Sequence, residues 1–172
     1  MIKGIVAVGE NWEIGKNNGL LFSLKKDMQH FKTTTMNKIV VMGENTLLSF
    51  PGGRPLKNRV NIVLCPEGHE YENCICFHSF EQMVKFVQVL AKEYDVFVIG
   101  GGMMYKSMLP YYDEVIVTKV LATDPEATVF FPNLDKDVNF EEIDRTDNMK
   151  DEDYIIHFST YRRIELNQQL ER

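Results

Sequence analysis

The sequence has few cysteines, no excess of basic residues and no long hydrophobic run, and each of these absences excludes a class of protein. The three cysteines are Cys65, Cys74 and Cys76, an odd number that provides no disulfide framework. No apolar stretch approaches the roughly 18 residues of a membrane-spanning helix, so we expect no membrane partner. The 25 acidic residues outnumber the 19 basic ones, and the net charge is −6. A broad basic face is therefore not expected, and nucleic acid is not a predicted partner.

Cys74 and Cys76 are separated by one residue in a short apolar stretch. Alternate residues of a strand share one face, so the pair could form a redox or metal site. No second cysteine pair and no histidine cluster accompanies it, and we therefore favour small apolar residues of a strand and predict no metal. The amino-terminal segment 1–8 is too short for the apolar core of a signal peptide. Together with the cysteine usage, this predicts a cytoplasmic protein.

The chain contains no linker rich in serine, glycine or proline, no repeat and no low-complexity block, so residues 1–172 are predicted to form a single domain. Short runs rich in valine and isoleucine are typical of strands buried on both faces. They span 2–8, 39–42, 60–64, 74–77, 96–99 and 115–120. Helical periodicity lies between them, over 23–36, 80–94 and 103–109.

The carboxyl-terminal part has a different pattern. Residues 140–146 and 154–163 are extended runs joined by the polar turn 147–151, and we predict an antiparallel hairpin added at the sheet edge. The whole pattern indicates an α/β fold. We expect a single mixed, mostly parallel central sheet of about eight strands, with this hairpin at its end and about four flanking helices.

Asp27 is the most informative residue of the chain. It lies three residues after Leu24 and four before Phe31, so it shares the inward face of the predicted helix. An acid in a first turn, favoured by the helix dipole, is the simplest interpretation. However, other residues already fill the polar side of this helix: Lys25, Lys26, Gln29, His30 and Lys32. A carboxylate on an apolar face needs a partner, and no local cation supplies one. We therefore predict a ligand that presents two N–H groups in one plane.

Glycine-rich turns indicate a second function, the binding of phosphate. The strand at 96–99 runs into Gly100, Gly101 and Gly102 and then into a helix. Glycines allow a phosphate to approach the backbone, and the helix amino terminus supplies N–H donors. A glycine triplet can also be a simple tight turn, and this one lacks the spacing of the Rossmann and P-loop motifs. A second turn of this kind spans 43–46, and two such turns indicate a dinucleotide.

Two loops complete the predicted site. The loop 50–59 ends with Arg59, which could clamp a carboxylate through two hydrogen bonds, although a solvated loop arginine is the simpler interpretation. The segment 9–19 is predicted to be a long flexible loop, and such loops often act as lids.

These residues resemble the bacterial dihydrofolate reductase family in their order and spacing. The resemblance runs from Met1 to about Arg163. It rests on Ala7, Ile14, Gly15, Asn18, Asp27, Phe31, Thr46, the run Gly53-Arg54-Pro55-Leu56, Arg59, the three glycines, Tyr105 and Thr118. It implies reduction of 7,8-dihydrofolate by a hydride from C4 of reduced nicotinamide to C6 of the pterin, with protonation at N5. NADPH is the implied cofactor, dihydrofolate and antifolates are the implied ligands, and the protein is expected to be a monomer.

The resemblance also implies roles for individual residues. Asp27 would bind the ring N–H and the 2-amino group of the pterin, and Thr118 would orient that carboxylate. Phe22 stands at the catalytic position where the family usually has a tryptophan that holds an ordered water. The implied substrate contacts are Ile5, Ala7, Asp27, Met28, Phe31, Phe50, Leu56, Arg59, Ile99 and Thr118, with Arg59 taking the α-carboxylate of the glutamate tail.

The implied cofactor contacts gather around the two glycine-rich turns. They are Ala7, Ile14, Gly15, Asn18, Gly43, Glu44, Asn45, Thr46, Leu64, Cys65, His78, Ile99, Gly100, Gly101, Gly102, Met103, Met104 and Tyr105. The Gly100–Gly101 peptide is expected to be cis, as it is in the family.

The sequence departs from the family where the adenosine 2′-phosphate of NADPH would bind. Glu44 and Met103 stand where the family commonly has basic residues, and Cys65 replaces a polar residue. His78 stands where a lysine can assist, and a histidine is only partly charged near neutral pH. A carboxylate beside the phosphate would repel it. We therefore predict a weak preference for NADPH over NADH.

Two other functions fit parts of the pattern. A pyrimidine reductase of riboflavin synthesis shares the general fold, and a catalytically idle pterin- or nucleotide-binding module would keep Asp27. Arg59 and the helix face from Asp27 to Phe31 favour folate as the substrate. The glycine triplet and the segment 15–18 favour an enzyme over an idle module.

Overall fold

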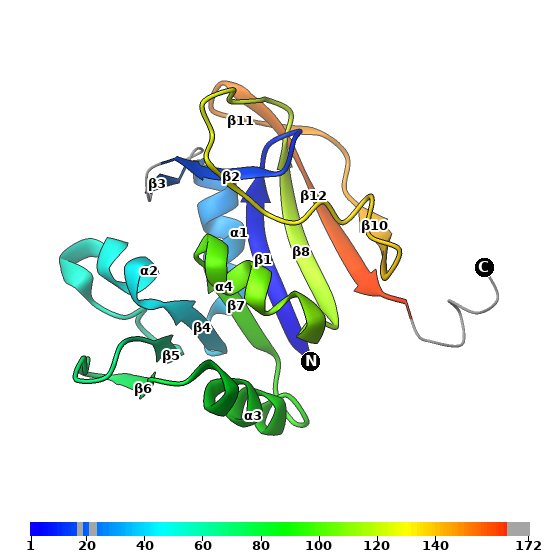
Figure 1. Cartoon of the computed structure of the whole chain (residues 1–172). Coiled ribbons are helices and arrows are strands. Elements are labelled where there is room, and N and C mark those ends of the chain that lie inside the picture. The colour runs from blue at the N-terminus through cyan, green and yellow to red at the C-terminus, as the bar shows by residue number, and fades with distance from the viewer. Residues whose placement is uncertain (17–18, 21–23, 165–172) are drawn as a thin grey trace.

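The computed structural model describes residues 1–16, 19–20 and 24–164, and a large sheet runs through its centre (Figure 1). The strands of this sheet are β1 (Ile2–Val8), β4 (Ile39–Gly43), β5 (Val60–Leu64), β6 (Cys74–Phe77), β7 (Val96–Gly100), β8 (Glu114–Val120), β10 (Phe140–Arg145), β11 (Met149–Asp151) and β12 (Tyr154–Arg163). They follow the order β10-β12-β8-β1-β7-β4-β5-β6, and β11 pairs with β12 outside this path. Neighbouring strands from β8 to β6 are parallel, whereas β12 runs antiparallel to β8, β10 and β11. The predicted mixed, mostly parallel sheet is confirmed.

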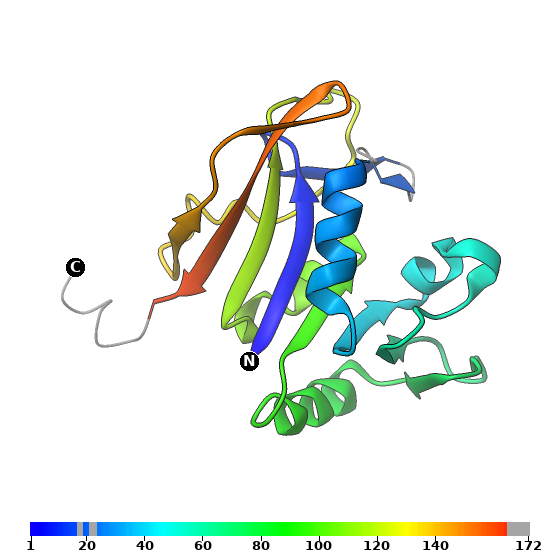
Figure 2. The same ribbon diagram turned by 180° about the vertical axis from the view of Figure 1, so that it is seen from behind.

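Four α-helices lie among the described residues, on both faces of this sheet. They are α1 (Lys25–Thr35), α2 (Glu44–Ser49), α3 (Phe80–Leu90) and α4 (Gly102–Ser107), and two short 3-10 helices span Pro51–Gly53 and Leu109–Tyr111. Helices α3 and α4 lie in front of the sheet in Figure 1, and α1 lies in front of it in the view from behind in Figure 2. None of the helices in this part of the chain is long and apolar enough to cross a membrane.

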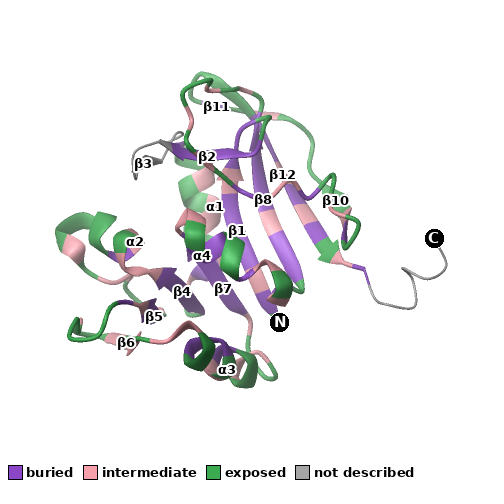
Figure 3. Ribbon diagram, viewed as in Figure 1, coloured by how far each residue is buried: buried purple, intermediate pink, exposed green. Residues whose placement is uncertain are grey.

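Apolar side chains pack on both faces of the sheet, and strands such as β4 and β7 are buried on both sides (Figure 3). On one face, side chains of α3 and α4, including Met83, Val87 and Met104, pack with Val41 and Val98. On the other face the core residues are Ile5, Val40, Met42, Leu47, Val63, Cys65, Phe97 and Ile99. This alternation along each strand explains the continuous hydrophobic runs of the sequence.

Several element boundaries differ from the predicted ones. Helix α1 begins at Lys25, and its predicted start at Ser23 lies outside the described residues. Helix α3 begins after Ser79, whose hydroxyl accepts a hydrogen bond from the Gln82 N–H, but it ends at Leu90 instead of residue 94. Helix α4 spans Gly102–Ser107 instead of 103–109. Part of the predicted turn 147–151 is the strand β11.

The prediction of a long flexible loop over residues 9–19 is wrong for its described residues, 9–16 and 19. This segment contains β2 (Glu13–Lys16), which forms a second sheet with β3 (Gly19–Leu20) and β9 (Val129–Phe130). Trp12, Glu13 and Ile14 are buried. The Glu13 carboxylate accepts hydrogen bonds from the N–H groups of Asn11 (2.8 Å) and Asp124 (3.2 Å). This segment is therefore held in place by contacts with residues that lie more than 100 positions later in the chain.

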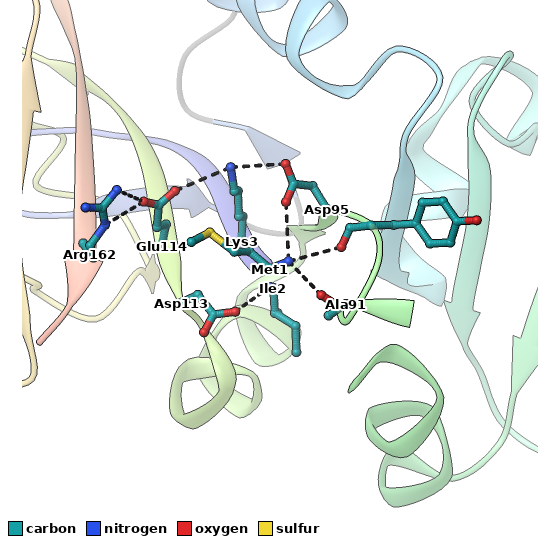
Figure 4. Close-up of polar contacts among 9 residues, drawn as sticks. Met1, Ile2, Lys3, Ala91, Asp95, Asp113, Glu114 and Arg162 are labelled. Carbon is teal, nitrogen blue, oxygen red and sulfur yellow. Dashed lines mark hydrogen bonds and ion pairs between the residues drawn. The ribbon is translucent and has the colours of Figure 1, made fainter. Parts of the chain in front are cut away.

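A row of ion pairs closes the end of the sheet where β1 and β7 begin (Figure 4). Arg162 Nη2 lies 2.7 Å from Glu114 Oε2, and Lys3 Nζ lies 3.5 Å from the other oxygen of this buried glutamate. Lys3 Nζ also lies 3.4 Å from Asp95 Oδ2. These contacts join β12, β8, β1 and the residue before β7. The functional residues are therefore sought at the opposite end of the sheet, where the parallel strands have their carboxyl ends.

Candidate functional site

Many of the predicted site residues that the structure describes lie around the carboxyl ends of β1, β4 and β7, whereas Arg59 lies just before β5. Strand β7 lies between β1 and β4 and pairs with both. In the sheet, β5 and β6 lie beyond β4, and β8 lies beyond β1. Crevices outside the carboxyl ends of strands, where the strand order switches, are the usual ligand sites of open α/β sheets.

Asp27 is half-buried in the first turn of α1, and it faces β8. The hydroxyl of Thr118, a buried residue of β8, donates a 2.7 Å hydrogen bond to Asp27 Oδ1. Burial raises the pKa of the Asp27 carboxyl and outweighs the Thr118 hydrogen bond and the charge of His30, which both lower it. No lysine or arginine of the described residues forms an ion pair with Asp27. An ionised carboxylate can accept about four hydrogen bonds, so it has capacity for a ligand with two donors.

An apolar wall lies beside this carboxylate. Phe31 from α1, Phe50 and Leu56 from the loop after α2, and the strand residues Ile5 and Ile99 belong to one hydrophobic cluster. Phe31, Phe50 and Leu56 are only half-buried, so part of each side chain faces outward. The wall can therefore cover an aromatic ring whose polar edge contacts Asp27.

The two glycine-rich turns are neighbours in the sheet, because Met42 of β4 pairs with Gly100 of β7. The Gly100–Gly101 peptide is cis, as expected, and Gly100 has a φ of 126°. A Cβ atom on Gly100 would lie 3.3 Å from the Tyr105 ring. Gly43, at the other turn, has open space where a Cβ would be. Gly100 is buried against Tyr105, whereas Gly43, Gly101 and Gly102 are partly exposed, so backbone at both adjacent turns fits a dinucleotide pyrophosphate.

Arg59 lies at the far end of the apolar wall. Its Nε donates a hydrogen bond of 3.2 Å to the Thr35 hydroxyl, and Nη1 donates one of 3.0 Å to the Lys57 carbonyl. Partial burial lowers the pKa of this guanidinium, which stays charged at neutral pH. No carboxylate of the described residues pairs with it. A cation that is held in place without an acidic partner is suited to bind a ligand carboxylate.

Glu44, the first residue of α2, is bound to the segment between β5 and β6. Its Oε2 contacts His69 Nδ1 and accepts a 2.7 Å hydrogen bond from the Tyr71 hydroxyl, and these hydrogen bonds lower the Glu44 pKa. Nearby, His78 Nε2 lies 2.9 Å from Glu70 Oε1, and Nδ1 lies 3.1 Å from the Cys65 carbonyl. These hydrogen bonds raise the His78 pKa. Among the described residues, this edge of the site carries two acid–histidine pairs, and no arginine takes part in them.

Comparison with known proteins agrees with this arrangement. Residues 1–163 match the model of a family described as Dihydrofolate reductase. The dihydrofolate reductase of Haemophilus influenzae is 37% identical over 147 residues, which cover 83% of this chain and 88% of that protein. That of Staphylococcus haemolyticus is 32% identical over 163 residues, covering 93% and 94%. The chain belongs to the dihydrofolate reductase family.

A solved structure supports the same assignment. The dihydrofolate reductase from Enterococcus faecalis complexed with NADP(H) and RAB-propyl superimposes with a TM-score of 0.83. It is 29% identical in sequence, and the match covers 96% of this chain and 97% of that one.

The face that α1 turns toward the sheet differs from the predicted one at two positions. Met28, expected to be an inward apolar residue, is 61% exposed. His30, expected on the polar side, is half-buried and stacks on Phe158 of β12, with ring centroids 4.0 Å apart. The helix is rotated so that Asp27, His30 and Phe31 face the sheet and the hairpin.

The remaining residues that were named from the sequence as cofactor contacts differ in how far they are buried. Met104 and Tyr105 are buried beneath the glycines, where the Tyr105 hydroxyl donates to the Ile5 carbonyl and the Tyr105 ring lies against Gly100. Met103 is 86% exposed. Ile14 and Gly15 are buried in β2. Asn18 and the predicted catalytic Phe22 lie outside the described residues.

Two buried carboxylates in this family member were missed in the sequence. Glu13 secures β2, as described above, and Asp151 of β11 contacts the start of α1. Glu13 lies between Trp12 and Ile14, and this apolar setting was the available indication of burial. Asp151 lies in a run of charged residues, which is the ordinary pattern of a solvated turn, so its sequence gave no indication of its contacts.

Proposed function

We propose that this protein reduces 7,8-dihydrofolate to 5,6,7,8-tetrahydrofolate for one-carbon metabolism, with NADPH as its cofactor. The observation that carries the proposal is the half-buried Asp27 carboxylate, which is hydrogen-bonded to Thr118 and lies beside an apolar wall. Few ligands offer two adjacent N–H donors on the edge of a flat ring, and a pterin is one of them. We further propose that residues 1–172 form one domain and that the protein is a cytoplasmic monomer.

Asp27 would accept hydrogen bonds from the ring N–H and the 2-amino group of the pterin, while Thr118 keeps the carboxylate in one orientation. The negative charge of Asp27 favours the protonated form of the bound pterin, and solvent delivers the proton to N5. Because burial raises the Asp27 pKa, this charge develops at a higher pH than it would on a fully solvated aspartate.

The rest of the substrate would extend along the apolar wall. Ile5, Phe31, Phe50 and Leu56 would cover the pterin and the aminobenzoyl ring, and antifolates of similar shape would occupy the same space. Arg59 would bind the α-carboxylate of the glutamate tail, because its guanidinium is already oriented by Thr35 and Lys57.

NADPH supplies the hydride when it is bound. Gly100, Gly101 and Gly102, with the turn of residues 43–46, would hold the pyrophosphate against the backbone. Ala7, Ile14 and Ile99 would hold the nicotinamide beside the pterin. Ala7 pairs with Thr118 in the sheet, so the two ring sites share the same pair of strands. The protein thus contributes orientation and exclusion of water.

The decisive experiment follows the loss of reduced-nicotinamide absorbance with purified protein, NADPH and dihydrofolate, with Asp27→Asn as the matched control. Turnover that depends on Asp27 supports the proposal. Turnover of a ribosylaminopyrimidine instead would identify a pyrimidine reductase. Tight pterin binding without turnover would identify an idle binding module. Either of the last two outcomes would overturn the proposal.

A further inference from the structure

Helix α1 carries Asp27, yet it lacks a capping residue of its own. The residue at its N-cap position is Leu24, and no side chain at that position caps the helix. The first N–H groups of a helix have no partner within the helix and need an acceptor from elsewhere. Because Asp27 lies in this first turn, whatever satisfies these groups also fixes the position of its backbone.

The acceptor comes from β11, more than 120 residues later in the chain. Asp151 is a buried carboxylate, 3% exposed. Its Oδ2 accepts a 2.8 Å hydrogen bond from the Lys26 N–H and a 3.2 Å hydrogen bond from the Asp27 N–H. Lys26 adds a second connection, because its Nζ donates a 2.6 Å hydrogen bond to the Lys150 carbonyl. The hairpin therefore holds the first turn of α1 through backbone and side-chain contacts.

We propose that Asp151 is a positioning residue for Asp27. The Asp151 carboxylate fixes the first turn of α1, so that the Asp27 carboxylate meets Thr118 and the substrate. The charge of Asp151 also acts on the ionisation of Asp27. The inference rests on the proposed function, and it names a residue that does not itself touch the substrate. The hydrogen bonds to Lys26 and Asp27 carry the positional part. The 3.2 Å contact between Asp151 Oδ2 and the Asp27 N–H places the Asp151 charge beside Asp27 and carries the electrostatic part.

The charged and titratable groups around Asp27 come from four elements. His30 lies on α1 itself, Thr118 approaches from β8, and Asp151 approaches from β11. The fourth, Tyr105 of α4, is buried, and the Asp27 charge contributes to raising its pKa. Burial is the largest cause of the raised Asp27 pKa, His30 and Thr118 lower it, and the negative charge of Asp151 raises it further. Removing the Asp151 charge should therefore lower the pH at which Asp27 ionises.

The variant Asp151→Asn separates the two parts of the role. Its amide oxygen can still accept the Lys26 and Asp27 N–H groups, but the charge is gone. The inflection of the kcat/KM–pH profile that is due to Asp27 is recognised because Asp27→Asn lacks it. In Asp151→Asn we expect this inflection to move to lower pH by about half a unit. Asp151→Ala removes both the charge and the acceptor. We expect it to show the same shift and to lower kcat/KM for dihydrofolate by roughly ten-fold through loss of geometry.

Glu152→Gln is the matched control. Glu152 is the next residue, and its carboxylate lies 3.9 Å from Lys25 Nζ at the surface, so the variant removes one charge from the same turn. It leaves the acceptor of the α1 N–H groups in place. Its pH profile should coincide with that of the wild type.

Three outcomes decide the matter. A downward shift in Asp151→Asn with an unchanged Glu152→Gln profile supports the proposal. Coincident profiles for Asp151→Asn and the wild type overturn it, even if Asp151→Ala fails to fold. If the wild type does not reduce dihydrofolate, the proposed function fails, and a carbon-13 NMR titration of the Asp27 carboxyl in wild type and Asp151→Asn tests the inference independently. In that titration a lowered Asp27 pKa supports it and an unchanged pKa overturns it.

Discussion

The Thr118 hydroxyl donates a 2.7 Å hydrogen bond to Asp27 Oδ1, and this contact joins the first turn of α1 to the centre of β8. Thr118 is 2% exposed, so its hydroxyl has little access to water. A buried hydroxyl beside a carboxylate donates to it, which stabilises the ionised form and restricts the carboxylate to one orientation. The contact therefore has consequences for both the geometry and the ionisation of the proposed substrate-binding acid.

Replacing Thr118 by valine should shift the activity profile in the direction opposite to Asp151→Asn. Loss of the hydrogen bond raises the Asp27 pKa, so the inflection due to Asp27 moves to higher pH, and kcat/KM for dihydrofolate falls about ten-fold. Steady-state kinetics across the pH range measures both effects. Thr118→Ser keeps the hydroxyl and should restore the wild-type inflection, and a serine variant that behaves like valine would contradict this account.

Asp27→Asn should reduce turnover most at neutral and high pH. The amide has no charge to favour the protonated pterin, and at high pH little of the free substrate is already protonated. We expect a loss of roughly 100-fold at about pH 8 and a smaller loss at about pH 5. Turnover numbers at the two pH values check this, and an unchanged rate at the higher pH would refute the role of Asp27.

Arg59→Ala should raise KM for dihydrofolate by about 30-fold and leave KM for NADPH within about two-fold, since a carboxylate–guanidinium contact is worth on the order of 2 kcal/mol. Arg54→Ala is the matched control, because Arg54 is an exposed arginine of the same loop. A change confined to cofactor binding would contradict the placement of Arg59. Dihydropteroate, which lacks the glutamate tail, should be a similar substrate for wild type and variant.

Glu44 should weaken the preference for NADPH over NADH. Its carboxylate is held by His69 and Tyr71 at the start of α2, where it would repel the 2′-phosphate. We expect kcat/KM values for the two cofactors within about ten-fold of each other in the wild type, and a larger NADPH preference in Glu44→Gln. Glu72→Gln, an exposed carboxylate of the same connecting segment, is the control. A wild-type preference for NADPH of about a thousand-fold would contradict the prediction.

His157 should make the stability of the protein depend on pH. It is buried on β12, and its ring nitrogens have no hydrogen-bond partner among the described residues. Burial lowers its pKa, the charges of Arg145 and Lys119 lower it further, and Glu142 opposes them. The unfolded state then binds more protons than the folded state. The contribution of His157 to stability is therefore present above its unfolded pKa of about 6.5 and is lost as the pH falls toward its folded pKa.

Urea unfolding at several pH values around this window measures the effect. In the wild type the free energy of unfolding should fall as the pH decreases through the window. In His157→Gln this fall should be smaller, since the amide does not titrate. Equal pH dependence in the two proteins would show that His157 is not responsible.

Much of the fold was predictable because its elements are encoded locally. Strands such as β4 and β7 are buried on both faces, and their continuous valine and isoleucine runs differ from every loop. Gly100 is favoured by the neighbouring Tyr105 ring and Gly102 by the Val129 side chain, and a run of three glycines is visible in any sequence. The small sheet of β2, β3 and β9 was missed because its strands have two to four residues, too few for a periodic pattern.

The orientation of α1 was only partly predictable. Helical spacing places Asp27 between Leu24 and Phe31, and the structure agrees. The same spacing favoured Met28 as an inward residue and His30 as an outward one, and both were wrong. The reason is that the hairpin supplies Phe158, a flat surface on which an imidazole stacks, whereas nothing in the local sequence announces that partner.

The sequence by itself determined most strands of the large sheet, the two glycine-rich turns, and the presence of an acid and an arginine that suit a folate-like ligand. These features depend on near neighbours in the chain, through hydrophobic runs, the missing Cβ of glycine and helical spacing. The tertiary structure alone decided how Asp27 is held and ionised. Its hydroxyl donor is 91 residues away and the acceptor of its N–H is 124 residues away, so both reach it only when the sheet is assembled. Contacts made across such distances follow from the packing of whole elements, and no local pattern records them.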